Sequence, residues 1–69
     1  MNNVLVLKQN TFAEKIRRLR LSEQLTQRDL ARLAGVNRED IDRIEHDTPL
    51  QLETRLKILK VLYAKSLFH

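Results

Sequence analysis

The sequence predicts an all-α fold, a compact bundle of four to five helices. The 69 residues include one Gly and one Pro, so few positions would interrupt a helix. Long stretches are rich in Leu, Arg, Lys, Glu and Ala, which are strong helix formers. Hydrophobic residues make up 42% and charged residues 32% of the chain, a balance typical of a folded domain.

A first helix is expected to begin at Thr11 and to end near Glu23. Thr11 and Glu14 have the spacing of a capping box, in which each side chain satisfies a free backbone N–H group. Apolar residues recur after this cap at helical spacing, which predicts a buried face. This face comprises Phe12, Ile16 and Leu19, with Leu21 as a further candidate.

A second helix is expected between Thr26 and Gly35. Thr26 can cap its start, and the helix dipole favours the carboxylate of Asp29 in the first turn. Gly35, the one Gly in the chain, indicates a C-cap with positive φ. The expected buried stripe comprises Leu30, Ala31, Leu33 and Ala34.

Two further helices are expected after the turn at Gly35. Asn37 offers an N-cap for the third helix, and Thr48-Pro49 ends it because a residue before proline is pushed out of the α region. A fourth helix follows from about Leu52. The expected buried residues are Ile41 and Ile44 in the third helix, and Leu52, Leu56, Leu59 and Leu62, widened by Ile58 and Val61, in the fourth. The expected exposed face of the fourth helix carries Arg55, Lys57 and Lys60.

Composition argues against several classes of function. The chain has no Cys, which excludes disulfides and thiolate metal sites. It has no phosphate-cradling glycine loop and no spaced cluster of metal ligands, so we expect neither an enzyme nor a bound metal or cofactor. The apolar run at residues 4–7 is far shorter than the roughly 18 residues of a transmembrane span. We therefore expect a cytoplasmic protein without membrane contact.

The charge distribution suits a polyanionic partner. The net charge is +4 and the pI is about 10.0. Residues 8–36 carry seven basic and three acidic side chains, whereas residues 37–47 carry two basic and five acidic ones. Residues 48–69 carry four basic side chains and one acidic one. An acidic segment thus lies between two basic segments.

The two helices expected within residues 26–47 have the lengths typical of a helix-turn-helix, and Gly35-Val36-Asn37 forms the short turn between them. The run LTQRDLARLAGVNREDIDRIE, residues 25–45, resembles the lambda-repressor-like, or Xre/Cro, helix-turn-helix family. The resemblance extends from about Thr11 through Leu62. Its most specific parts are Leu25-Thr26-Gln27, Leu30-Ala31, Gly35-Val36, and Ile41 with Arg43-Ile44-Glu45. It implies a protein that binds double-stranded DNA and whose third helix enters the major groove.

The resemblance also implies roles for individual residues. The DNA base contacts would be made by Arg38, Glu39, Asp42 and Arg43. Contacts with the DNA backbone would be made by Gln27 and Asn37, to which the basic surroundings add Arg17, Arg28 and His46. In the family, the pair that matches Arg20 and Glu45 forms an internal salt bridge between the first and third helices.

The third helix departs from the family pattern. It carries Glu39, Asp40 and Asp42 where the family usually has Ser, Thr or Gln. Either Glu39 and Asp40 stabilise the helix N-terminus, or the helix-turn-helix reads a partner protein or needs one before it binds DNA well. Asp47 stands where the family usually has Gly, and Asp tolerates a left-handed conformation moderately well.

We divide the chain into an N-terminal arm or short strand, residues 1–10, and the helix-turn-helix DNA-binding domain, residues 11–69. The arm contains a β-prone run that is too short to be stable alone. This expected dimer strand comprises Val4, Leu5, Val6 and Leu7. It could pair with residues 65–68 of the same chain or with a second chain, unless residues 1–8 form a frayed tail.

Two functional hypotheses remain open. In the first, the chain is a sequence-specific transcription regulator, a repressor that binds a palindromic operator as a homodimer. In the second, it is an antitoxin-like or adaptor protein that mainly binds a toxin or other protein partner and autoregulates its operon. The acidic third helix and the unpaired hydrophobic strand motivate the second hypothesis.

Overall fold

The structure is a computed structural model that describes residues 11–67 and folds them into four helices. These are α2 (Phe12–Ser22), α3 (Gln27–Ala34), α4 (Arg38–Ile44) and α5 (Leu52–Leu67). The all-α prediction is confirmed, and residues 11–67 contain no strand. The strand predicted at residues 4–7 lies outside the described residues. A strand at residues 65–67, its suggested partner within the chain, is wrong because these residues belong to α5.

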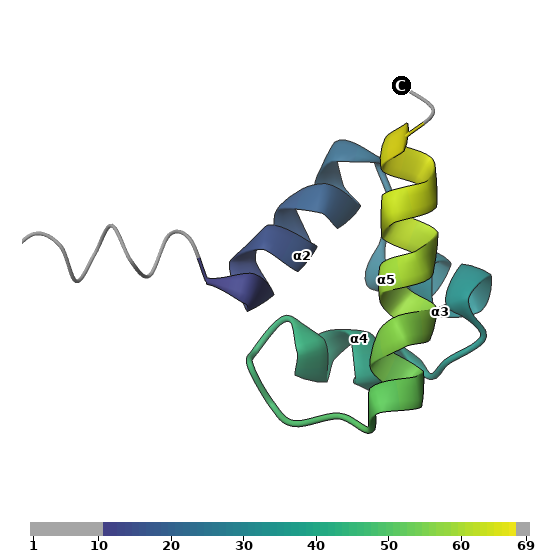
Figure 1. Ribbon diagram of the computed structural model, residues 1–69. Coiled ribbons are helices and arrows are strands. Elements are labelled where there is room, and N and C mark those ends of the chain that lie inside the picture. The colour runs from purple at the N-terminus through teal and green to yellow at the C-terminus, as the bar shows by residue number, and fades with distance from the viewer. Residues whose placement is uncertain (1–10, 68–69) are drawn as a thin grey trace, which may run out of the picture.

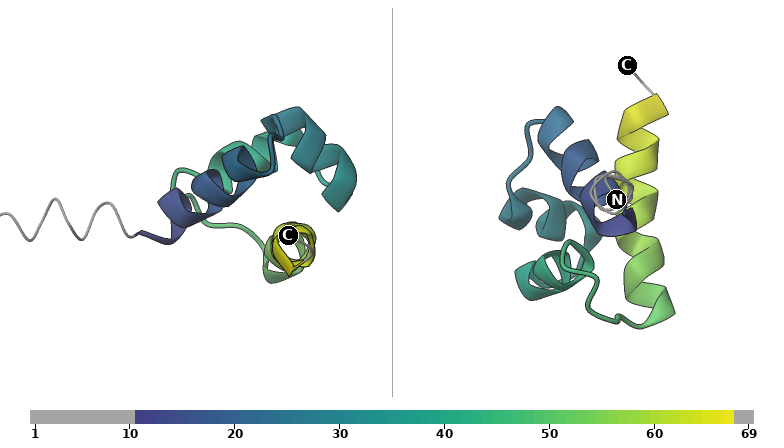
Figure 2. Two further views of the ribbon diagram at one scale, coloured as in Figure 1. Left: turned by 90° about the horizontal axis from the view of Figure 1, so that it is seen from above. Right: turned by 90° about the vertical axis from the view of Figure 1, so that its left-hand side faces the viewer.

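The longest helix, α5, forms one side of the fold, and α2, α3 and α4 lie together on the other (Figures 1 and 2). α5 packs against each of the three other helices. All four helices contribute to one hydrophobic core. Its buried residues are Ile16, Leu30, Ala31, Ala34, Ile41, Ile44, Ile58 and Leu62.

The first two described helices begin and end much as the sequence predicts. The Thr11 hydroxyl accepts a hydrogen bond from the Glu14 N–H at 3.2 Å. At α3, the Thr26 hydroxyl accepts from the Asp29 N–H at 3.0 Å, and the Asp29 carboxylate accepts from the Thr26 N–H at 3.1 Å. Gly35 closes α3 with a φ of +71°, a conformation that glycine adopts without steric cost.

The cap of α3 should make stability depend on pH. The pKa of Asp29 lies below its ordinary value because the Thr26 N–H donates to the carboxylate, and the Thr26 side chain and Arg32 add to this effect. A depressed folded pKa gives stability that is present above the unfolded pKa and is lost as pH falls through the folded pKa. Asparagine does not titrate, so the Asp29→Asn variant lacks this loss. As the pH is lowered below about 4, we therefore expect its free energy of unfolding to decrease less than that of the native chain. Urea denaturation at a series of pH values measures this, and parallel profiles would contradict it.

The third predicted helix is shorter than expected. The sequence predicts its end at Thr48-Pro49, but α4 ends at Ile44. Asp47 adopts a left-handed φ of +57°, and the Thr48 N–H donates to the carbonyl of Arg43 at 2.9 Å. This arrangement takes the chain out of the helix before proline can act.

The buried face of α5 matches part of the predicted stripe. Ile58 and Leu62 are completely buried as predicted, and Leu59 and Val61 pack partly buried against the core, but Leu52 and Leu56 are 68% and 54% exposed. Each residue turns an α-helix by about 100°, so Ile58 lies about 120° around the helix from Leu52. Packing against α2, α3 and α4 selects the Ile58 side. Two further residues predicted to be buried, Leu21 and Leu33, are also exposed.

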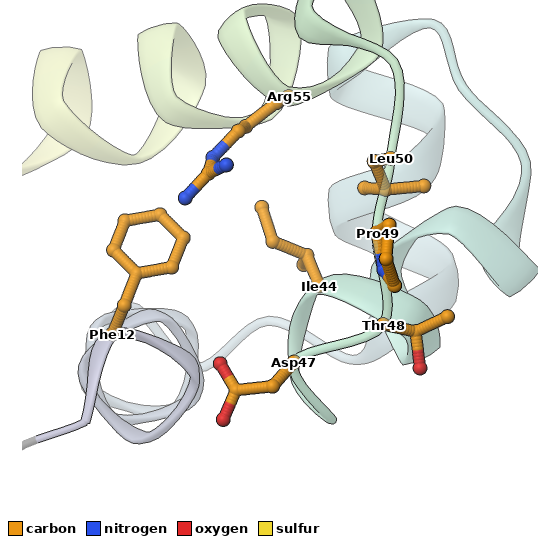
Figure 3. Close-up of a pocket in the computed structure, with 7 residues that line it drawn as sticks. All are labelled: Phe12, Ile44, Asp47, Thr48, Pro49, Leu50 and Arg55. Atoms are coloured by element: carbon orange, nitrogen blue, oxygen red, sulfur yellow. The ribbon is translucent and has the colours of Figure 1, made fainter.

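A cation–π contact joins the start of α2 to α5. The guanidinium carbon of Arg55 lies 4.6 Å from the centroid of the Phe12 ring. Figure 3 shows these two side chains at a surface pocket of about 280 Å³. The pocket is lined by Phe12, Ile44, Asp47, Thr48, Pro49, Leu50 and Arg55. The loop between α4 and α5 therefore lines the same pocket as Phe12 of α2 and Arg55 of α5.

Candidate nucleic-acid interface

α4 has a buried side and a solvent-facing side. Ile41 and Ile44 lie in the core, where they are 0% and 4% exposed. This anchoring leaves the other side of the helix free to face a ligand. The predicted base-contact residues Arg38, Glu39, Asp42 and Arg43 are all exposed there.

Arg38 is positioned by Gln27, the first residue of α3. Arg38 Nη1 donates to Gln27 Oε1 at 3.0 Å. Gln27 Nε2 in turn donates to Glu45 Oε1 at 3.2 Å, so both ends of one amide are used. The family resemblance implied a DNA-backbone contact for Gln27 and did not indicate this bridge between α3 and α4. The one available signal was the amide itself, which carries a donor and an acceptor.

Arg20 and Glu45 form a two-bonded ion pair between α2 and the end of α4. Arg20 Nε lies 2.6 Å from Glu45 Oε2, and Arg20 Nη2 lies 3.1 Å from Glu45 Oε1. The remaining Arg20 nitrogen, Nη1, donates to the carbonyl of Leu25 at 2.9 Å. The two side chains are 10% and 1% exposed. The pair that the family resemblance implied is thus present, and its planar geometry fixes how α4 sits against α2.

The acidic residues of α4 fall into two groups. The Asp40 carboxylate accepts from the Asn37 N–H at 3.2 Å and from Arg43 Nη1 at 3.4 Å, and its side chain is 16% exposed. Asp40 therefore holds the start of the helix and positions an arginine. Glu39 and Asp42 remain on the solvent-facing side. The negative charge that a ligand would meet on α4 comes mainly from these two residues.

The surface beside Arg38 is concave and basic. This concavity, of about 510 Å³, is lined by Arg20, Leu21, Leu25, Thr26, Gln27, Arg28 and Arg38. The charge of Arg20 is matched by Glu45, but Arg28 and Arg38 are exposed. The structure thus brings Gln27, Arg28 and Arg38 together, and Arg28, whose exposed guanidinium group could contact a DNA phosphate, lies beside the predicted base contact Arg38.

The other residues predicted to contact the DNA backbone lie outside this concavity. Asn37 is the exposed N-cap of α4. His46 lies just beyond the other end of α4, where its Nδ1 is 2.8 Å from the carbonyl oxygen of Asp42. Arg17 is exposed on α2 and lines a separate hollow with Glu14, Arg18 and Leu21.

Within residues 11–67, no three His, Asp or Glu side chains are arranged to hold a metal ion. None of the four helices is long and apolar enough to cross a membrane.

Comparison with known proteins agrees with the geometry. A protein-family model described as Helix-turn-helix matches residues 16–62, which is more than half of the chain. The match includes all of α3 and α4, together with parts of α2 and α5. No curated protein sequence matches the chain significantly. The chain therefore belongs to the lambda-repressor-like (Xre) helix-turn-helix family, a family of DNA-binding transcription regulators.

Proposed function

We propose that this protein is a sequence-specific repressor that binds a palindromic operator as a homodimer. The proposal rests on the exposure and orientation of two arginines on the solvent-facing side of α4. Arg38 and Arg43 are exposed, and each guanidinium group is oriented by a hydrogen bond, to Gln27 and to Asp40 respectively. An oriented guanidinium group can donate two parallel hydrogen bonds to O6 and N7 of guanine.

Affinity for the DNA backbone would come from outside α4. Glu39 and Asp42 on the same side of α4 would repel phosphates. The net charge of +4 and the exposed Arg28 beside Arg38 would supply the attraction instead. Binding should therefore weaken steeply with salt, with a log–log slope of roughly −0.9 for each neutralised phosphate.

Arg43→Ala tests base reading. We expect this change to weaken binding to the preferred duplex by about 1–3 kcal/mol and to affect a random duplex far less, because a base contact is lost. Fluorescence anisotropy at one fixed salt concentration measures both affinities.

Arg32→Ala is a matched control for Arg43→Ala. Arg32 lies 3.3 Å from Asp29 three residues earlier on α3, and Arg43 lies 3.4 Å from Asp40 in the same arrangement on α4. The Arg32 variant should retain the preference for the selected duplex. Equal losses on both duplexes, or equal losses in both variants, would contradict base reading by Arg43.

Selection from a random duplex pool tests sequence specificity as a whole. The proposal requires an enriched sequence with two related half-sites, since a homodimer presents two copies of α4. If no sequence is enriched, specific DNA reading by the purified protein is refuted.

Sedimentation of the full chain and of a variant lacking residues 1–8 tests the proposed dimer strand. Identical monomeric behaviour of the two would overturn it.

The antitoxin-like or adaptor function is the second candidate, and the exposed carboxylates of Glu39 and Asp42 favour it. In that case α4 would face a protein partner, and DNA binding would serve autoregulation of the operon. A stable protein partner together with an empty duplex selection would favour this function over the first.

A further inference from the structure

A second apolar face runs along α5 on the side away from the core. Its side chains are spaced by four, seven and four residues, which keeps them on one side of an α-helix. We name these residues the α5 stripe: Leu52, Leu56, Tyr63 and Leu67, with exposed fractions of 68%, 54%, 47% and 81%. Ile58 and Leu62 are the buried core residues of α5, and Leu59, which lies between Leu56 and Tyr63, packs partly buried against the same core. The four residues of the stripe stay about half or more exposed.

The shape of the α5 stripe fits another helix. α5 has 16 residues and is therefore about 24 Å long, and the stripe extends from its first residue to its last. A narrow apolar line with this spacing is the pattern by which one helix packs along another. Four large apolar side chains in one exposed line are also more than the scattered single residues normal on a protein surface.

The charges beside the α5 stripe favour an acidic occupant. Lys60 follows Leu56 by four residues and precedes Tyr63 by three, so it lies next to both on the helix surface. Glu53 precedes Leu56 by three residues and so also borders the stripe, but along its whole length α5 carries four basic side chains and this one acidic one. A helix with Glu or Asp along both borders of its apolar face would complement this charge.

A second copy of α5 fits the stripe less well. Antiparallel pairing would match Leu52 with Leu67 and Leu56 with Tyr63 of the other copy. This register brings the two Lys60 side chains close to the two-fold axis and places two basic helices side by side. Like charges in this position oppose association.

We propose that the α5 stripe is the docking surface for an amphipathic helix of a partner protein, with acidic residues bordering the apolar face of that helix. The proposed DNA contacts of Arg28, Arg38 and Arg43 come from α3 and α4 and share no residue with the stripe. The docking proposal therefore does not depend on DNA recognition, and either can fail alone.

A pair of designed peptides provides the probe. Both are fluorescein-labelled, helix-forming peptides of about 18 residues with leucines at the spacing of the α5 stripe; one has Glu along both borders and the other has Lys. Titration with the full chain at low salt should show saturable binding of the Glu-bordered peptide, at least about tenfold tighter than binding of the Lys-bordered peptide. Added salt should reduce this difference.

Two variants of the full chain locate the binding site. Leu56→Ser should weaken binding of the Glu-bordered peptide by at least about tenfold, because it places a hydroxyl group in the middle of the stripe. Leu21→Ser is the control, since Leu21 is equally exposed, 56% against 54%, but lies on α2. Leu56→Ser should keep its thermal midpoint within a few degrees of the native one, as should Leu21→Ser, and its affinity for any selected duplex should be unchanged.

Several results would overturn the proposal. These are no binding of the Glu-bordered peptide, equal binding of the two peptides, or binding that Leu56→Ser leaves unchanged. Sedimentation provides a further test. A dimer of the full chain that Leu56→Ser dissociates would assign the α5 stripe to a second copy and overturn the proposed partner.

Discussion

Replacement of Glu45 by alanine is expected to destabilise the fold by about 3–5 kcal/mol, a large share of the roughly 5–15 kcal/mol that holds a domain folded. The Glu45 carboxylate accepts hydrogen bonds from Arg20 Nε and Nη2 and from Gln27 Nε2. Without it, the guanidinium group of Arg20, 10% exposed, would stay buried without a counter-charge. Urea denaturation followed by far-ultraviolet circular dichroism measures the loss.

A double variant separates the cost of an unpaired charge from the value of the ion pair. Arg20→Met with Glu45→Leu removes both charges and keeps apolar volume, so it should be more stable than Glu45→Ala alone. Asp42→Ala, an exposed carboxylate on α4, should change the free energy of unfolding by no more than about 0.5 kcal/mol. A loss below about 1 kcal/mol for Glu45→Ala would show that this carboxylate does not compensate a buried charge.

Ile58→Ala is expected to cost about 2–5 kcal/mol, the second large effect. Ile58 is completely buried on the side of α5 that faces the other three helices. Shortening it removes apolar contact and leaves a cavity, and both terms destabilise the folded state. The same urea experiment measures the loss.

Leu52→Ala is the matched control for Ile58→Ala, because it also shortens an aliphatic side chain on α5. Leu52 is 68% exposed, so we expect a change of no more than about 0.5 kcal/mol. The reverse order of the two effects would mean that Leu52, and not Ile58, faces the core.

Local features of this fold could be predicted because the interactions that make them join residues close in the chain. The Thr26 and Asp29 cap spans three residues, and the positive φ of Gly35 follows from its lack of a side chain. The buried face of α5 could be predicted only in part. The predicted stripe included Ile58 and Leu62, which are buried, as well as Leu52 and Leu56, which are not, and the choice between them depends on packing against distant segments.

The candidate site likewise has local features that could be predicted from the sequence and long-range contacts that could not. The exposure of Arg38 and Arg43 follows from the burial of Ile41 and Ile44 on the opposite side of the same short helix. The bond from Arg38 to Gln27 joins residues 11 apart, and the bond from Gln27 to Glu45 joins residues 18 apart. Both bonds depend on how closely α3 approaches α4, which the pattern of residue types does not specify.

The shortness of α4 limits how much sequence information one copy can read. Its seven residues extend about 10 Å, and base pairs are stacked about 3.4 Å apart, so the helix spans about three base pairs. Three base pairs can form about 64 different sequences. This number is too small to define one unique binding site among the roughly 10⁶–10⁹ competing positions of a genome. Recognition of a unique binding site therefore requires a second recognition element, either in another copy of this chain or in a partner protein. The distance between the two half-sites would then also decide which sequences are bound.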